Sequence, residues 1–157
     1  MNLNNNIFSK ILVPIDGSTN SMKAIDYAVD LAEKYNSELI AFHVLYSQSG
    51  FAFHKETVAG TITSSSLNDL NLEAKQEAEK WFEEINKRAD KKNVQIKTEV
   101  VLTVISIVEA ILTYAEKENI DLIVIGSKGK SGWKKLIVGS VASGISTYAH
   151  CPILIVK

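Results

Sequence analysis

The stretch LIVIGSKGKSGWKKLIVGS, residues 122–140, joins an apolar run, a glycine-rich loop and the start of a helix-like segment. Two residues separate Gly126 from Gly129, and nine separate Gly129 from the pair Gly139 and Ser140. This order is typical of a strand that ends, a loop of exposed backbone amides, and a helix N-terminus with a hydroxyl at its cap. Because such amides and the helix dipole attract anions, the stretch predicts a phosphate site at the end of a strand.

The charge around this loop supports phosphate over a plain tight turn, which two glycines alone would favour. From Leu122 to the C-terminus the chain has five lysines and no Asp or Glu, a formal +5, so the rest must carry −6 to give the net −1. Four of these lysines lie in or beside the loop: Lys128, Lys130, Lys134 and Lys135. The positive field is therefore local to the glycine-rich loop.

Two common phosphate-binding motifs do not match the chain. In a Walker A loop the GKS at residues 129–131 would require an earlier glycine at position 124, which is Val124. The first apolar run is followed by DGSTNS, and not by the GxGxxG of a dinucleotide-binding fold. The loop after the fourth run therefore remains the candidate site.

Bulk composition bounds the class of protein. A chain of 157 residues with 46% hydrophobic and 22% charged residues predicts one globular domain over residues 1–157. The near-zero net charge argues against a nucleic-acid partner. The lone Cys151 permits no internal disulfide, the polar N-terminus lacks the features of a signal peptide, and no apolar run is long enough to span a membrane. We therefore expect a cytoplasmic protein without membrane insertion.

Five short apolar runs alternate with helix-like stretches along the chain. The runs occupy residues 11–15, 39–45, 96–102, 122–125 and 153–156. Their β-branched and nearly unbroken apolar character predicts strands of a parallel sheet covered on both faces. The third run partly alternates, which indicates an edge strand. Helices are expected from residue 18 or 19 to 35, from 68 to 91, after the capping box that begins at Ser106, and from Gly139-Ser140 to before Pro152.

This order of elements predicts a doubly wound α/β fold. If the strand order is 3-2-1-4-5, the winding reverses between the first and fourth strands, and a ligand crevice lies beyond Asp16 and Gly126. Asp16 is then a candidate contact for a ribose, a base or a phosphate-bound metal, although a helix-entry Asx turn would also explain it. Pro14 cannot donate a ladder hydrogen bond, which predicts a bulge or backbone opening nearby.

The remaining candidates are weaker. His43 is best interpreted as a satisfied core histidine, and no group of His, Cys or carboxylates has the spacing of a metal cage. Residues 46–67 form a long Ser-, Gly- and Thr-rich connection, the kind of segment that serves as a lid or partner contact. The last run, residues 153–156, would be an apolar edge strand that either pairs with its copy across a two-fold axis or is covered by that connection.

Together these residues resemble the universal stress protein family over essentially the whole chain. The opening ILVPIDGS, the segment DLIVIGSKGKSGWKKLIVGSVASGI and the ending CPILIV are similar to that family's landmarks. The spacing G-x2-G-x9-G-[ST] is the pattern of its ATP-binding branch. The resemblance implies a Rossmann-like, adenine nucleotide alpha-hydrolase-like sheet of order 3-2-1-4-5 with helices on both faces. It also implies ATP bound with Mg or Mn.

The resemblance further implies a homodimer and a set of binding residues. The dimer would be joined through Ile153, Leu154, Ile155 and Val156. The residues flanking the adenosine would be Pro14, Asp16 and Val44. The loop would begin with Ile125 and Gly126, and ribose and phosphates would be held by Gly129, Gly139, Ser140 and Val141, with Lys128 and Lys130 adding charge. One departure concerns the rim after the third strand, where the family often has Gly and then Pro but this chain reads LTVI at residues 102–105.

Three functions are compatible with this sequence. The first is a dimeric ATP-binding stress or regulatory module with little or no turnover. The second is a slow ATP hydrolase or phosphotransferase in which Asp16 positions a metal or a water; product formation lost in Asp16→Ala would favour it. The third is a protein-interaction module that captures an unknown protein partner through residues 46–67 independently of nucleotide.

Overall fold

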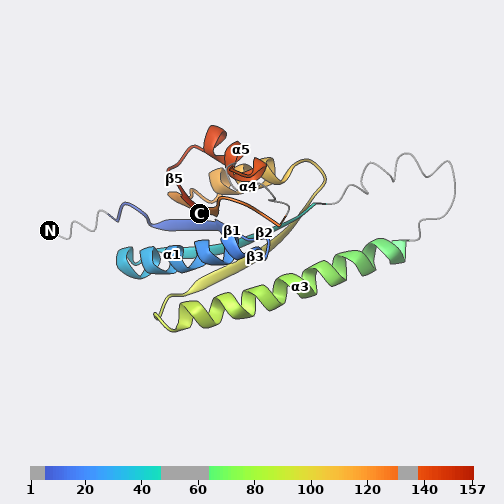
Figure 1. The fold of residues 1–157 in the computed structure, drawn as a ribbon, viewed down its shortest axis with the longest axis horizontal. Coiled ribbons are helices and arrows are strands. Elements are labelled where there is room, and N and C mark those ends of the chain that lie inside the picture. The colour runs from blue at the N-terminus through green and yellow to red at the C-terminus, as the bar shows by residue number, and fades with distance from the viewer. Residues whose placement is uncertain (1–5, 47–63, 131–137) are drawn as a thin grey trace.

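A five-stranded parallel sheet in the order β3-β2-β1-β4-β5 forms the centre of the molecule (Figure 1). The computed structural model describes residues 6–46, 64–130 and 138–157, and for residues 64–71 it describes the backbone alone. The strands are β1 (Lys10–Pro14), β2 (Glu38–Tyr46), β3 (Ile96–Thr103), β4 (Leu122–Gly126) and β5 (Ile153–Val156). The predicted doubly wound order is confirmed, and β3 is an edge strand as its alternating pattern indicated.

The helices are α1 (Thr19–Tyr35), α3 (Ser64–Asp90), α4 (Ile107–Lys117) and α5 (Ser140–Tyr148). The prediction of one long connection over residues 46–67 is wrong at both ends, because Tyr46 ends β2 and α3 begins at Ser64. The serine-rich stretch that suggested a loop is helical, and serine is a residue that helix N-termini favour. The rest of that predicted connection, residues 47–63, lies outside the described residues.

Alternate side chains of each central strand pack on opposite faces of the sheet. On β1, Ile11 and Val13 belong to the core beneath α1 and α3, whereas Leu12 belongs to the core beneath α4 and α5. Figure 1 shows these two helix pairs on either side of the sheet. This two-sided burial explains the nearly unbroken apolar runs in the sequence. Each described helix is too short or too polar to cross a membrane.

Capping and ion pairs fix the helices that border the ends of the strands. The Ser18 hydroxyl accepts a hydrogen bond from the amide of Ser21 and so caps α1, directly after β1. The α3 helix is fastened to α1 by Arg88, which donates to the carbonyl of Met22 at 3.1 Å and to the Asp26 carboxylate at 3.0 Å. These contacts place the middle of α3 beside the carboxyl end of the sheet.

Candidate functional site

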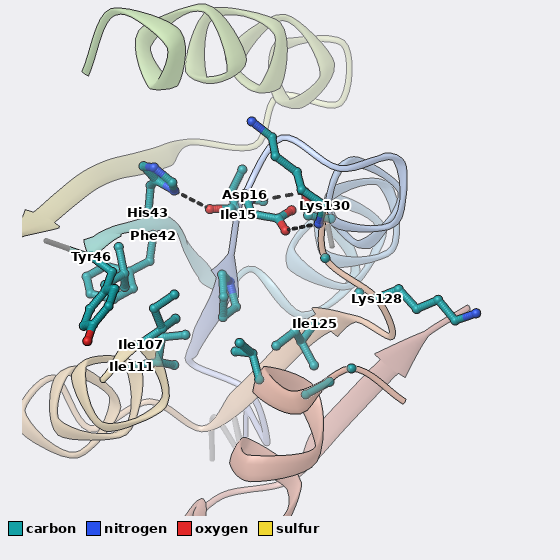
Figure 2. Close-up of a pocket in the computed structure, with 18 of the residues that line it drawn as sticks. Ile15, Asp16, Phe42, His43, Tyr46, Ile107, Ile111, Ile125, Lys128 and Lys130 are labelled. Carbon is teal, nitrogen blue, oxygen red and sulfur yellow. Dashed lines mark hydrogen bonds between the residues drawn. The ribbon is translucent and has the colours of Figure 1, made fainter. Parts of the chain in front are cut away.

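A cavity of about 460 Å³ opens at the carboxyl ends of β1, β2 and β4. It is the place where the crossover direction changes, and doubly wound sheets bind ligands there. All nine residues that the sequence nominated line it: Pro14, Asp16, Val44, Ile125, Gly126, Gly129, Gly139, Ser140 and Val141. The structure therefore brings together residues from four separate segments of the chain around one hollow (Figure 2).

The sheet itself opens toward this cavity. The β1 strand pairs with β2 at five positions, but with β4 only at Ile11 and Leu12. The two strands part before Pro14, a residue without an amide hydrogen to donate to a neighbouring strand. This matches the backbone opening that Pro14 predicted, and it exposes the end of β4 to a ligand.

The loop after β4 is tied to its surroundings by backbone hydrogen bonds. The amide of Ser127 donates to the carbonyl of Val156 on β5 at 2.7 Å. The carbonyl of Ser127 in turn accepts from the amide of Gly139 at 2.7 Å, so the loop returns to the point where it began. On the α1 side, the hydroxyl of Ser18 donates to the carbonyl of Lys128 at 3.4 Å.

Asp16 joins the end of β1 to the far end of this loop. One carboxylate oxygen accepts from the amide of Ser18 at 3.0 Å, and the other accepts from the amide of Lys130 at 2.9 Å. Burial would raise the pKa of Asp16, but the hydrogen bonds from Ser18, Lys130 and Ser21 outweigh it, so the pKa lies below its ordinary value. The carboxylate thus makes the Asx turn that the sequence offered for Asp16 and also anchors the loop, while its contact with a ribose, a base or a metal stays a prediction.

The glycines of the loop are required by space. A Cβ on Gly129 would lie 2.5 Å from the Asp16 carboxylate, and one on Gly126 would lie 2.7 Å from the backbone of Asn20. Backbone conformation is not what requires glycine here, since Gly17 is the only glycine of the described chain with a positive φ. Close approach of α1 and of Asp16 to the loop leaves no room for a side chain.

The N-terminus of α5 meets the loop without a hydroxyl cap. Gly139 is the N-cap and makes no side-chain hydrogen bond, while Ser140 is the first helical residue. The prediction of a hydroxyl at the cap is therefore wrong by one position. Because the first amides of a helix have no partner within it, the start of α5 presents donors at the cavity.

One wall of the cavity is apolar. It is formed by Phe42 and Val44 of β2, Ile107 and Ile111 of α4, and Ile125 of β4, together with Val141. Phe42 is stacked against Tyr114 with the ring centroids 4.3 Å apart, which fixes this wall from behind. The rim residues that depart from the family pattern, 102–105, do not line the cavity.

The sequence did not place α3 at this site. Ala74, Glu77 and Trp81 of that helix line the cavity, whereas the sequence alone predicted only a helix over this segment. Lys130 reaches from the loop to this helix: its ammonium lies 3.0 Å from the Glu77 carboxylate and 4.3 Å from the centroid of the Trp81 ring. In sequence, 48 residues separate Lys130 from Trp81, so no local pattern could signal this contact.

His43 is buried, as a core histidine should be, and also faces the cavity. Its Nδ1 lies 2.6 Å from the carbonyl oxygen of Ile15 (Figure 2), and its ring meets Trp81 edge-on. A carbonyl only accepts hydrogen bonds, so Nδ1 carries the hydrogen. Burial lowers the pKa of His43, against the opposing effect of the Ile15 carbonyl.

Of the other lysines predicted near the site, the structure describes Lys128 but not Lys134 or Lys135. Lys128 lines the cavity through its place in the loop, and Figure 2 shows its side chain extending away from Lys130. Lys134 and Lys135 lie outside the described residues. Within residues 6–46, 64–130 and 138–157, no group of three or more His, Cys, Asp or Glu side chains is placed to hold a metal ion.

Comparison with known proteins gives a consistent result. Residues 8–157 match the model of the universal stress protein family. The chain is 33% identical over 152 residues to universal stress protein MJ0531 of Methanocaldococcus jannaschii, covering 97% of this chain and 84% of that protein. It is 35% identical over 162 residues to universal stress protein YxiE of Bacillus subtilis, covering 96% of this chain and all of that protein.

Solved structures share the fold. The universal stress protein UspA from Lactobacillus plantarum superposes with a TM-score of 0.74 at 24% identity, covering 96% of this chain and 98% of that one. A universal stress protein in complex with cAMP superposes with a TM-score of 0.69 at 24% identity, covering 96% and 98% of the two chains. An Arabidopsis thaliana protein of the same family with AMP bound gives 0.65 at 14% identity, covering 95% and 91%.

Proposed function

The chain belongs to the universal stress protein family, and from that premise we propose that it binds ATP with Mg²⁺ or Mn²⁺. In this proposal it belongs to the ATP-binding branch and acts as a homodimeric, cytoplasmic stress-response and regulatory module, a single domain over residues 1–157 with little or no turnover. The protein partner that receives its signal is unknown.

One observation carries the proposal: the cavity has an apolar wall on one side and a loop of backbone donors on the other. An adenine ring would lie between Val44, Ile125 and Val141, flanked by Pro14 and Asp16. Its phosphates would lie along Gly126, Gly129, Gly139 and Ser140, where bare backbone and the start of α5 favour negative charge. Two members of the family are solved with cAMP and AMP, which supports an adenine nucleotide as the ligand.

The chain's own residues suit a divalent cation only as a companion of the phosphates. Asp16 and Glu77 are the carboxylates that line the cavity, and Asp16 already accepts hydrogen bonds on both of its oxygens. A cation would therefore be held chiefly by phosphate oxygens, and it would neutralise their charge. The same engagement of Asp16 makes it a poor general base, which favours binding over hydrolysis.

We expect Mg-ATP to stabilise the protein against heat. Ligand at about 100 times its dissociation constant adds roughly 2.7 kcal/mol to the free energy of unfolding. In a domain of this size that corresponds to a rise in Tm of roughly 5–10 °C. Differential scanning fluorimetry with ATP, AMP and cAMP, each with and without magnesium, measures the rise and ranks the ligands. An unchanged Tm at saturating concentrations of all three would contradict the proposal.

The proposed dimer uses the edge of β5 that no described strand pairs with. The carbonyl of Pro152 accepts from Ile123 of β4, and that of Val156 accepts from Ser127, the residue after β4. By the two-residue period of a strand, the amides of Ile153 and Ile155 therefore point away from the sheet. An unpaired apolar edge of this kind invites a second copy. The sequence also offered the long connection as a cover for this edge, and residues 47–63 of that connection lie outside the described residues.

We expect Ile155→Pro to convert the dimer to a monomer while the fold is kept. Proline removes one outward amide hydrogen and leaves the ladder between β4 and β5 intact. Light scattering coupled to size exclusion measures the mass of wild type and variant. Leu154→Pro is the comparison variant, because its amide points toward β4 and its loss should lower stability. A wild-type mass equal to one chain at high concentration would contradict the dimer.

A further inference from the structure

Lys130 bridges the glycine-rich loop and the α3 helix beside the cavity. Its backbone amide is anchored by the Asp16 carboxylate at 2.9 Å. Its side chain leaves the loop and runs over the Trp81 ring to Glu77, where the nitrogen lies 3.0 Å from a carboxylate oxygen. Figure 2 shows this side chain reaching from Asp16 toward the helix above it. The residue is therefore held at one end by the site and at the other by α3.

Among the described residues, two carboxylates line the cavity, and Glu77 has fewer hydrogen-bond partners than Asp16. Asp16 is occupied by two backbone amides, whereas Glu77 pairs with a side chain that can rotate away. The side chains of Lys130 and Glu77 are 52% and 56% exposed, so water screens the pair and its energy is small. Because this ion pair is weak, an anion on the loop could compete with Glu77 for the Lys130 ammonium.

We propose that Glu77 sets the preference of this site for the number of ligand phosphates by competing with those phosphates for the Lys130 ammonium. The inference rests on the proposed nucleotide function. Side-chain rotation alone transfers the ammonium from Glu77 to a phosphate, because the Lys130 backbone stays fixed to Asp16. The transfer leaves Glu77 unpaired beside added negative charge, and this cost grows with each phosphate. Glu77 thereby weakens the selection of ATP over AMP.

Calorimetry on the full chain tests this with four probes, adenosine, AMP, ADP and ATP, in EDTA so that no cation masks their charge. Replacing Glu77 with glutamine frees Lys130 and removes one negative charge. We expect Glu77→Gln to bind ATP about two- to fivefold more tightly than wild type, ADP and AMP progressively less so, and adenosine with unchanged affinity. In a Lys130→Gln background the gain from Glu77→Gln should be smaller, because the ammonium for which Glu77 competes is gone and only its direct repulsion of the phosphates remains.

Glu83→Gln is the matched control, since it makes the same charge change on the same helix, about 9 Å further along its axis, at an exposed residue that does not line the cavity. It should leave all four affinities as in wild type. An ATP-to-adenosine affinity ratio equal to wild type in Glu77→Gln, or weaker ATP binding, overturns the inference while nucleotide binding stands. Absence of heat with all four probes in wild type in EDTA overturns the inference, and absence of heat with magnesium present as well overturns the proposed function together with it.

Discussion

Gly129→Val protein is expected to fold like wild type and to bind ATP about 100-fold more weakly. A Cβ at this position would lie 2.5 Å from the Asp16 carboxylate oxygen, and valine adds two further methyl groups. Asp16 must then swing away, which breaks its hydrogen bond to the Lys130 amide and deforms the loop that would hold phosphates. Without ligand the displacement of Asp16 relieves the conflict, but ATP would need Asp16 and the loop in their original positions. Restoring them on binding at the upper end of the roughly 1–3 kcal/mol typical of overpacking corresponds to about 100-fold in affinity.

The fold should survive because Gly129 is exposed and its φ is not positive, so the backbone accepts a side chain. Thermal denaturation without ligand checks this, and calorimetry with Mg-ATP measures the affinity. Gly139→Ala is the graded comparison, because its Cβ would lie 3.3 Å from the nearest atom, the Ser127 carbonyl oxygen, and a small shift relieves the contact. It should lose less than about tenfold. Equal ATP affinity in Gly129→Val and wild type would show that phosphates do not occupy this loop.

The sequence was sufficient to predict the sheet and one side of the cavity. The strand order and the meeting of Asp16 with the glycine-rich loop follow from general rules, because parallel strands with right-handed crossovers bring their carboxyl ends to one edge. The nine predicted residues come from strand ends, from the loop and from the start of α5, which these rules bring to the same edge. The residues themselves indicated Pro14, Asp16, Gly126, Gly129, Gly139 and Ser140, whereas Val44, Ile125 and Val141 came from the family resemblance, and all nine line the cavity.

The side of the cavity formed by α3 could not be predicted in this way. Trp81 and Glu77 lie on a long amphipathic helix whose periodicity shows which face is buried but not where along the sheet the helix rests. That position depends on contacts such as Arg88 with Asp26, and on Gly17, whose φ of +75° and absent side chain leave space for Trp81. The phosphate-binding pattern includes the glycines after β4 but not Gly17, the glycine that lets α3 approach.

A different glycine reveals how firmly the loop is coupled to the fold. Gly126 is buried at the end of β4, and a Cβ there would lie 2.7 Å from the carbonyl carbon of Asn20 and 2.9 Å from the amide of Ser21. Both atoms are backbone in the first turn of α1. Unlike the Asp16 carboxylate near Gly129, they have no rotamer to change, so the conflict can be relieved only by moving the helix or the strand.

We therefore expect Gly126→Ala to lower the free energy of unfolding by about 1–3 kcal/mol, and Tm by roughly 2–12 °C. Displacing α1 from the loop also strains the hydrogen bond between Asn20 and the Ser127 hydroxyl, and ATP binding should fall with it. Urea denaturation of the ligand-free variant, beside Gly139→Ala and Gly129→Val, measures the cost. The loss of unfolding free energy should follow what the added side chain contacts. Gly126→Ala, which meets backbone that cannot rotate away, should lose the most, and Gly129→Val and Gly139→Ala, which do not contact α1, should lose little. A Gly126→Ala protein as stable as wild type would mean that α1 is not closely packed on the end of β4. The explanation that this packing shapes the loop would then be wrong.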